Sequence, residues 1–161
     1  MIAYIGFFLI LLAFLNALIL ISSKPLLSKV MPDYGSVILS SSKLLFPLIL
    51  FSFISLILSF LTNDFSLKYV SSNSNSLLPY YYKISATWAG HEGSMLLWCL
   101  VLSFWTFMAS VYSKDLDTDF RLKFLSIMGL LNIGFLAFLI FTSNPFEKNL
   151  SIPIDGRDLN P

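Results

Sequence analysis

Four long apolar runs, separated by polar segments, divide the 161-residue chain. They cover about residues 2–21, 44–61, 94–112 and 124–141, and none has the strict alternation of a β-strand. A helix rises about 1.5 Å per residue, so about 20 residues cross a hydrocarbon core about 30 Å thick. Backbone groups cannot stay unpaired in lipid, so each run is expected to be a helix. The pattern therefore predicts an all-α polytopic membrane protein with four transmembrane helices.

The polar segments indicate the orientation of these spans, because four spans place both chain ends on one side. Segments 22–43 and 113–123 hold six basic residues, whereas segments 62–93 and 142–161 hold four. The positive-inside rule assigns the first pair of segments to the cytoplasm. We expect a single membrane domain over 1–161, with both termini outside, an external loop 62–93 and an external tail 142–161. The first run lacks a preceding basic residue, so a retained anchor is expected rather than a signal peptide.

Composition narrows the class of protein further. Hydrophobic residues make up 57% of the chain and charged residues 12%, against about 25% charged residues in soluble domains. Such a chain is neither a water-soluble globule nor disordered. The net charge of +1 provides no surface for nucleic acid. One cysteine and one histidine exclude an intrachain disulfide and a metal site built from His and Cys alone within one copy.

Small and polar residues inside the runs bear on helix packing. Asn16 and Asn132 are interpreted as amides that join helices across the bundle. Trp98 and Trp105 are seven residues apart, so they share a helix face, which favours packing over a cofactor site. A glycine pair five residues apart in the fourth run, at 129 and 134, does not form a GxxxG face.

The segment 62–93 is the most distinctive part of the chain. It contains a Ser- and Asn-rich stretch at 71–76, followed by three consecutive tyrosines at 80–82 and by Trp88. Tyrosine and tryptophan are enriched at membrane interfaces, which favours a loop that touches the membrane surface. The alternative is a loop that packs on a partner or a ligand.

His91 is the one candidate for site chemistry. His91-Glu92 begins like a zinc-protease helix, but that motif needs a second histidine four residues later, where Met95 stands. A GxSxG elbow and a P-loop are also missing from the sequence. An imidazole is a possible axial ligand of haem iron. The alternative is a histidine that forms hydrogen bonds beside Glu92 at the mouth of the third span. We expect no catalytic residue and no metal ligand.

Six segments taken in order carry a family resemblance: 61–66 (LTNDFS), 70–76 (VSSNSNS), 78–85 (LPYYYKIS), 88–98 (WAGHEGSMLLW), 141–146 (FTSNPF) and 156–161 (GRDLNP). This succession resembles the N-terminal portion of the CcmF/NrfE family of cytochrome c maturation proteins. The residues that match the family motifs are Asn73, Asn75, Pro79, Tyr82, Trp88, Gly90, His91, Glu92, Gly93, Ser94, Trp98, Asn144, Pro145, Gly156, Arg157, Asp158, Asn160 and Pro161.

The resemblance implies a role in attaching haem covalently to apocytochrome c outside the membrane. It implies a b-type haem bound by the complete family protein, whose ligating histidines match no residue here. This chain would then be a scaffold that lacks the haem ligands and is not catalytic alone. The implied partners are the remainder of a CcmF-type protein, a CcmE-like haem chaperone, a CcmH-like thiol reductant, apocytochrome c and membrane lipid.

The same resemblance implies a multi-pass protein of the cell inner membrane, or of the mitochondrial inner membrane if the gene is organellar. Two other functions stay open from the residues. One is a subunit that transports haem or another small molecule, and the other is a structural subunit of a respiratory membrane complex.

Overall fold

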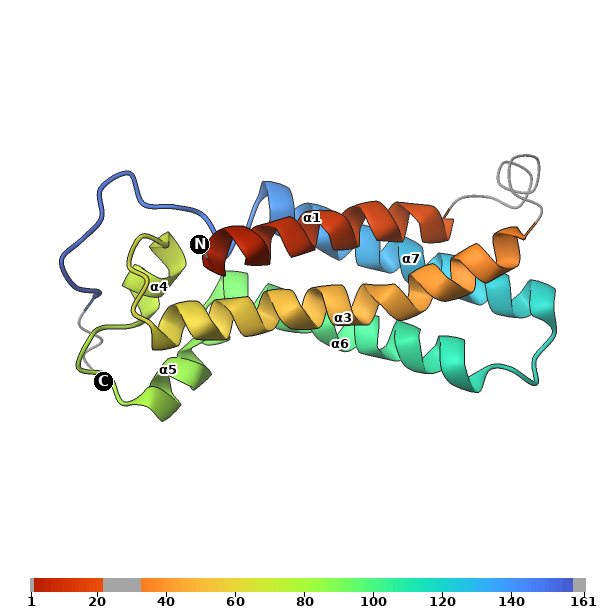
Figure 1. The fold of residues 1–161 in the computed structure, drawn as a ribbon, viewed down its shortest axis with the longest axis horizontal. Coiled ribbons are helices and arrows are strands. Elements are labelled where there is room, and N and C mark those ends of the chain that lie inside the picture. The colour runs from red at the N-terminus through yellow and green to blue at the C-terminus, as the bar shows by residue number, and fades with distance from the viewer. Residues whose placement is uncertain (1, 22–32, 158–161) are drawn as a thin grey trace.

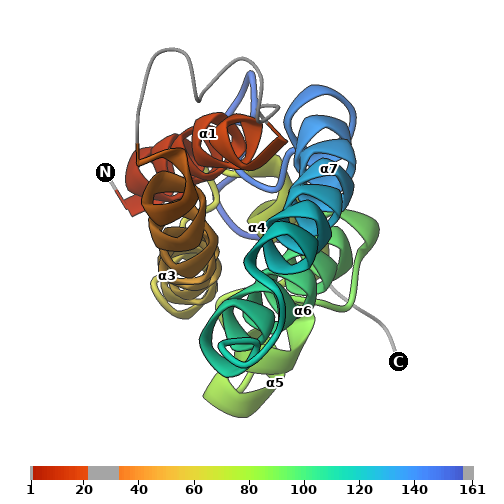
Figure 2. The same cartoon turned by 90° about the vertical axis from the view of Figure 1, so that its right-hand side faces the viewer.

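Four long helices lie side by side in the computed structural model, which describes residues 2–21 and 33–157 (Figure 1). They are α1 (Ile2–Ile21), α3 (Tyr34–Leu61), α6 (His91–Tyr112) and α7 (Thr118–Phe141). Helices α1 and α6 each pack against α3 and α7, so the four form a ring in cross-section (Figure 2). All four are long and apolar enough to cross a membrane. The predicted all-α architecture with four transmembrane helices is confirmed.

Three helices begin earlier than the apolar runs predicted. Helix α3 begins at Tyr34 rather than near residue 44, and α6 and α7 begin at His91 and Thr118 rather than near 94 and 124. The apolar run marks the part that crosses lipid, whereas the helix start depends on local backbone partners. The side chain of Asp117 accepts hydrogen bonds from the N–H groups of residues 119 and 120, both at 3.1 Å, and so caps α7.

Hydroxyl groups inside the helices find partners within their own helix. Ser55, Ser59, Ser103 and Thr106, among others, donate to a carbonyl three or four residues earlier, at 2.8–3.0 Å. Such bonds remove the cost of placing a hydroxyl in an apolar bundle. The many serines of α3 are therefore compatible with a transmembrane helix.

Polar side chains also join neighbouring helices. The amide nitrogen of Asn16 on α1 donates to the carbonyl of Ser41 on α3 at 2.8 Å, and Asn132 on α7 donates to the hydroxyl of Thr106 on α6 at 3.1 Å. The hydroxyl of Ser52 on α3 donates to the carbonyl of Gly6 on α1 at 2.9 Å. These bonds confirm the interpretation of Asn16 and Asn132 as links between helices.

Replacing Asn16 with leucine is expected to destabilise the bundle by about 0.6–2 kcal/mol, because the bond to α3 is lost. Asn132→Leu should cost less, since the buried Oδ1 of Asn132 has no hydrogen-bond partner among the described residues and leucine removes that unpaired acceptor. Equilibrium unfolding of the purified variants in detergent measures both values. Equal costs at the two positions would contradict this account.

Two short helices and the tail lie together at one end of the bundle, at the left in Figure 1. They are α4 (Lys68–Asn73), α5 (Tyr80–Ala86) and the segment 142–157. Together with the loops between Leu61 and His91 they form what we call the cap. The ring of Phe146 in the tail lies against Gly6 near the start of α1. The start of α1 and the tail therefore share one end, and the side of the membrane that this end faces stays a prediction.

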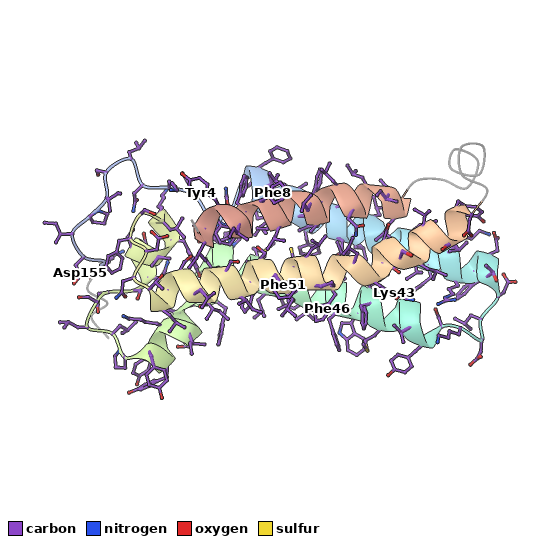
Figure 3. All side chains as sticks on the ribbon, in the orientation of Figure 1. Tyr4, Phe8, Lys43, Phe46, Phe51 and Asp155 are labelled. Atoms are coloured by element: carbon purple, nitrogen blue, oxygen red, sulfur yellow. The ribbon has the colours of Figure 1, made fainter. Side chains whose placement is uncertain are left out.

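The outer faces of the bundle are apolar and exposed, as expected for contact with lipid or with further helices. Figure 3 shows apolar side chains projecting from the outer surfaces of α1 and α3, with Phe8 and Phe51 labelled. Trp98 and Trp105 are 63% and 60% exposed on α6. They share a face as predicted, but they do not pack into the core of this chain. Seven-residue spacing fixes a common face and not the direction in which that face points.

Candidate functional site

The tail pairs with the start of the 62–93 segment. Leu67 and Lys148 form an isolated antiparallel bridge, and the N–H of Asn149 donates to the carbonyl of Ser66 at 2.9 Å. The side-chain amide of Asn149 donates to the carbonyl of Phe65 and to the hydroxyl of Ser71, both at 2.9 Å. One side chain of the tail thus fixes the path of the chain into α4.

A second contact closes the tail over the Ser- and Asn-rich stretch. The carboxylate of Asp155 accepts hydrogen bonds from the N–H of Ser76 at 2.9 Å and from its hydroxyl at 2.6 Å. These bonds, with the N–H of Gly156, hold the pKa of the Asp155 carboxyl below its ordinary value. A Cβ at Gly156 would overlap the carbonyl oxygen of Ser74, so the tail passes there at backbone distance. Figure 3 labels Asp155 at the cap end of the molecule.

Protonation of Asp155 is expected to release this contact. The pKa of the carboxyl is lowered in the folded protein, so its stabilising effect is complete above the ordinary value of 3.8 and is lost as the pH falls through the lower folded value. Asp155→Asn should lower the protection factor of the Ser76 amide severalfold at neutral pH, and the protection that remains should no longer change as the Asp155 carboxyl titrates. Glu147→Gln, at an exposed ion pair with Lys68, is the control and should leave the exchange unchanged. Exchange at Ser76 that is the same in all three proteins would contradict the assignment.

A buried lysine lies beneath this contact. Lys83 on α5 is 7% exposed, and its Nζ donates to the Oδ1 of Asn63 at 2.6 Å and to the carbonyl of Ser76 at 3.4 Å. Asn63 has a backbone φ of 53°, in the left-handed region that asparagine tolerates better than most residues. Asn63 and Lys83 therefore connect the end of α3, the Ser- and Asn-rich stretch and α5.

Tyr69 organises the Trp-Ala-Gly-His-Glu-Gly motif. Its hydroxyl donates to the carbonyl of Thr87 at 3.1 Å and accepts from the N–H of Gly90 at 3.0 Å. Burial raises the pKa of Tyr69, so the hydroxyl keeps its proton at neutral pH. A Cβ at Gly90 would lie 2.7 Å from the Tyr69 ring, and a Cβ at Gly93 would overlap the Thr87 carbonyl oxygen. Both glycines of the motif are thus required by the packing of α6 on the cap.

The remaining members of this motif point outward. Trp88 and His91 are exposed, and Glu92 is partly exposed. The predicted hydrogen bond of His91 beside Glu92 is not formed within the described residues; instead the imidazole lies edge-on to the ring of Phe138, 5.8 Å away between ring centres. The hydroxyl of Ser94 donates to the carbonyl of His91 within the same helix, at 2.9 Å.

His91 stands at the edge of an apolar groove between α6 and α7, with a volume of about 420 Å³. Helix α6 contributes His91 and Met95, and α7 contributes five residues that include Gly134 and Phe138. Among the residues of the described ranges, no group of three or more His, Cys, Asp or Glu side chains could hold a metal ion. The groove can therefore take an apolar surface, with one imidazole at its edge.

The other predicted motif residues divide between structural and exposed positions. Asn73 donates to the carbonyl of Tyr69 at 2.9 Å, and Asn144 accepts from the N–H of Phe146 at 2.9 Å. The N–H of Arg157 donates to the carbonyl of Ser71 at 2.7 Å. The side-chain oxygen of Asn75 is buried, as is Pro145, whereas Pro79, Tyr82 and Trp98 are exposed. Asp158, Asn160 and Pro161 lie outside the described residues.

Sequence reasoning missed the residues that hold the cap together. Asn149, Asp155, Asn63 and Lys83 were not among the candidates, although each forms hydrogen bonds there. The pairs Asn63–Lys83, Asp155–Ser76 and Asn149–Phe65 are 20, 79 and 84 residues apart in the sequence, so no local spacing reveals them. The glycines of the 88–94 motif were the available signal, because glycine within an apolar helix start indicates a close approach.

Comparison with known proteins gives consistent matches. Residues 88–161 match the family model described as "Cytochrome C assembly protein". The cytochrome c-type biogenesis protein CcmF of Pseudomonas fluorescens is 54% identical over 117 residues, which cover 72% of this chain and 18% of the relative. CcmF of Escherichia coli (strain K12) is 49% identical over 119 residues, covering 73% and 18%. A solved structure of the cytochrome c haem lyase CcmF matches with a TM-score of 0.79 at 27% identity, covering 91% of this chain and 25% of that one. The chain spans less than a fifth of the length of these curated relatives.

Proposed function

Because the chain belongs to the CcmF family of cytochrome c-type biogenesis proteins, we propose that it acts in cytochrome c maturation as a membrane scaffold of a haem lyase. The chain is a multi-pass membrane protein, as its four apolar helices and its relatives indicate. The observation that best supports the scaffold role is the cap. Motif residues Asn73, Gly90, Gly93, Gly156 and Arg157 are held there by direct hydrogen bonds or close backbone approaches.

We propose that the described residues hold no haem by themselves. Iron in a haem takes its axial ligands from opposite faces of the ring. His91 is the single imidazole, and Met95 lies one turn further along the same side of the same groove. Two side chains placed in this way cannot approach opposite faces of one haem. We propose that the b-type haem of the complete family protein is held by the part of the family's length that this chain does not span.

The cap supplies a surface for the other components. It presents Trp88, His91 and the three exposed tyrosines of α5 beside one another in the sequence, while its interior is fixed by buried hydrogen bonds. We propose that this end lies outside the cell inner membrane, facing haem and apocytochrome c. A CcmE-like haem chaperone and a CcmH-like thiol reductant are the proposed further partners.

Deletion of the segment that encodes this chain tests the proposal. We expect loss of covalently bound haem from c-type cytochromes, measured by haem staining of denaturing gels, while b-type cytochromes and apocytochrome levels persist. Complementation with the intact gene should restore the stain. Normal c-type cytochromes together with loss of one respiratory complex would support a structural subunit of that complex instead.

A further inference from the structure

The groove between α6 and α7 lies on the outer surface of the bundle, and no residue of the ranges 2–21 and 33–157 fills it. Its α7 wall includes Leu130 and Leu131, which are 59% and 47% exposed. Gly134 also lines it, and the rings of His91 and Phe138 lie beside each other in the lining, 5.8 Å between centres. Large apolar side chains thus surround a position that has no side chain.

Two other glycines of the transmembrane helices show how the absence of a side chain can allow close packing. At Gly6 the space of a side chain is taken by the ring of Phe146, and at Gly129 a Cβ would lie 2.5 Å from the Cβ of Leu20. Each of these glycines admits a close neighbour from another element. At Gly134 an added Cβ would meet nothing within 4 Å. Glycine in a helix interior lowers stability by about 1 kcal/mol relative to alanine. Gly134 therefore destabilises α7, and no neighbour among the described residues makes use of the missing side chain.

We infer that this groove is the docking site of a further transmembrane helix, supplied by the part of a CcmF-family protein that this chain does not span. The inference rests on the proposed function, because it takes the occupant from the same assembly. The relatives are more than five times as long as the matched region, so most of the family's length lies elsewhere. Small residues that let backbones approach are typical of helix contacts in membranes.

Two other occupants fit the groove less well. Lipid chains cover flat apolar faces as readily as hollow ones, so they give no reason for a glycine at 134. A second copy of this chain in a two-fold dimer would place the same surface against itself. Two hollows facing each other would enclose a void rather than fill one. A ridge of side chains on a different helix matches a groove of this shape.

Photocrosslinking in cells that carry the complete gene tests this docking. A benzoylphenylalanine is placed at Leu131 in the groove, and at Leu15, which is 57% exposed on α1, as the matched control. We expect Leu131 to yield several times more crosslinked peptide than Leu15, and mass spectrometry should map that peptide to an apolar span of a CcmF-family polypeptide outside residues 1–161. Gly134→Leu should reduce this product roughly tenfold by filling part of the groove, whereas Leu15→Phe should not.

Products at Leu131 that contain only lipid, or a second copy of residues 1–161, would overturn the inference. Crosslinking no greater than at Leu15 would do the same. The crosslink is read independently of haem staining. If the crosslink maps to a helix of a CcmF-family polypeptide, but c-type cytochromes survive deletion of the segment, the docking site is supported and the proposed function is contradicted. If Leu131 crosslinks only to lipid, but c-type cytochromes are lost on deletion, the proposed function is supported and the docking site is contradicted.

Discussion

Replacing Gly93 with alanine is expected to lower the free energy of unfolding by about 3 kcal/mol or more. The added Cβ would overlap the carbonyl oxygen of Thr87 and lie 2.5 Å from the hydroxyl of Tyr69. Backbone of the cap and backbone of α6 would have to separate, and the hydrogen bond of Tyr69 to Thr87 would be lost with that movement.

Gly134→Ala is the matched control, since it adds the same methyl group to another helix where nothing lies within 4 Å. It should leave stability unchanged or raise it by up to about 1 kcal/mol, because alanine is the better helix former. Denaturation of the purified proteins followed by circular dichroism measures both. A Gly93→Ala protein as stable as the control would show that the start of α6 does not pack on the cap as described.

The second large effect is expected at the buried lysine. Asn63→Gly preserves the left-handed backbone at φ 53° and removes the acceptor of the Lys83 ammonium group. A buried charged donor then loses its shorter hydrogen bond, at a cost of about 2–3 kcal/mol. Asn63→Ala should cost about 1 kcal/mol more, because alanine is strained in that conformation.

The double variant Asn63→Gly with Lys83→Met tests whether the stability lost in Asn63→Gly comes from the charge of Lys83. Methionine keeps most of the side-chain volume without the charge, so the double variant should recover most of the stability that Asn63→Gly loses. Thermal unfolding of the unchanged protein, of Asn63→Gly, of Lys83→Met and of the double variant under one condition gives the coupling energy between the two positions. Additive costs would mean that the two side chains do not interact.

The transmembrane helices could be predicted from the sequence, whereas the cap could not. Apolar runs report directly on which segments avoid water, and the all-α fold followed from that alone. The helix starts did not follow, because Asp117 caps α7 through its own side chain seven residues before the apolar run at 124. The spacing of Trp98 and Trp105 predicted their common face, but it could not predict that both side chains are exposed in this chain.

The cap depends on contacts between distant positions. Asp155 binds Ser76 across 79 residues, and Asn149 reaches Phe65 across 84. A single sequence carries no periodic signal for such pairs. The motif glycines were visible in the sequence. The groups that leave no room for a side chain there, Tyr69 and the carbonyl of Thr87, are brought close only by the fold. The motif residues thus separate into those that build the cap and those, such as Trp88 and His91, that it exposes.

The most direct test of the account is the yield of covalent haem on c-type cytochromes when only the exposed motif residues are changed. Trp88→Ala, His91→Ala and Glu92→Gln are combined in one gene, because none of these side chains forms a hydrogen bond within the described cap. Leu77→Ser is the control, because Leu77 is 91% exposed and is not one of the residues that match the family motifs. We expect a severalfold fall in haem-stained cytochrome for the triple variant, with normal amounts of the variant chain in the membrane, and no fall for Leu77→Ser. An unchanged haem yield in the triple variant would contradict a role of this cap in cytochrome c maturation.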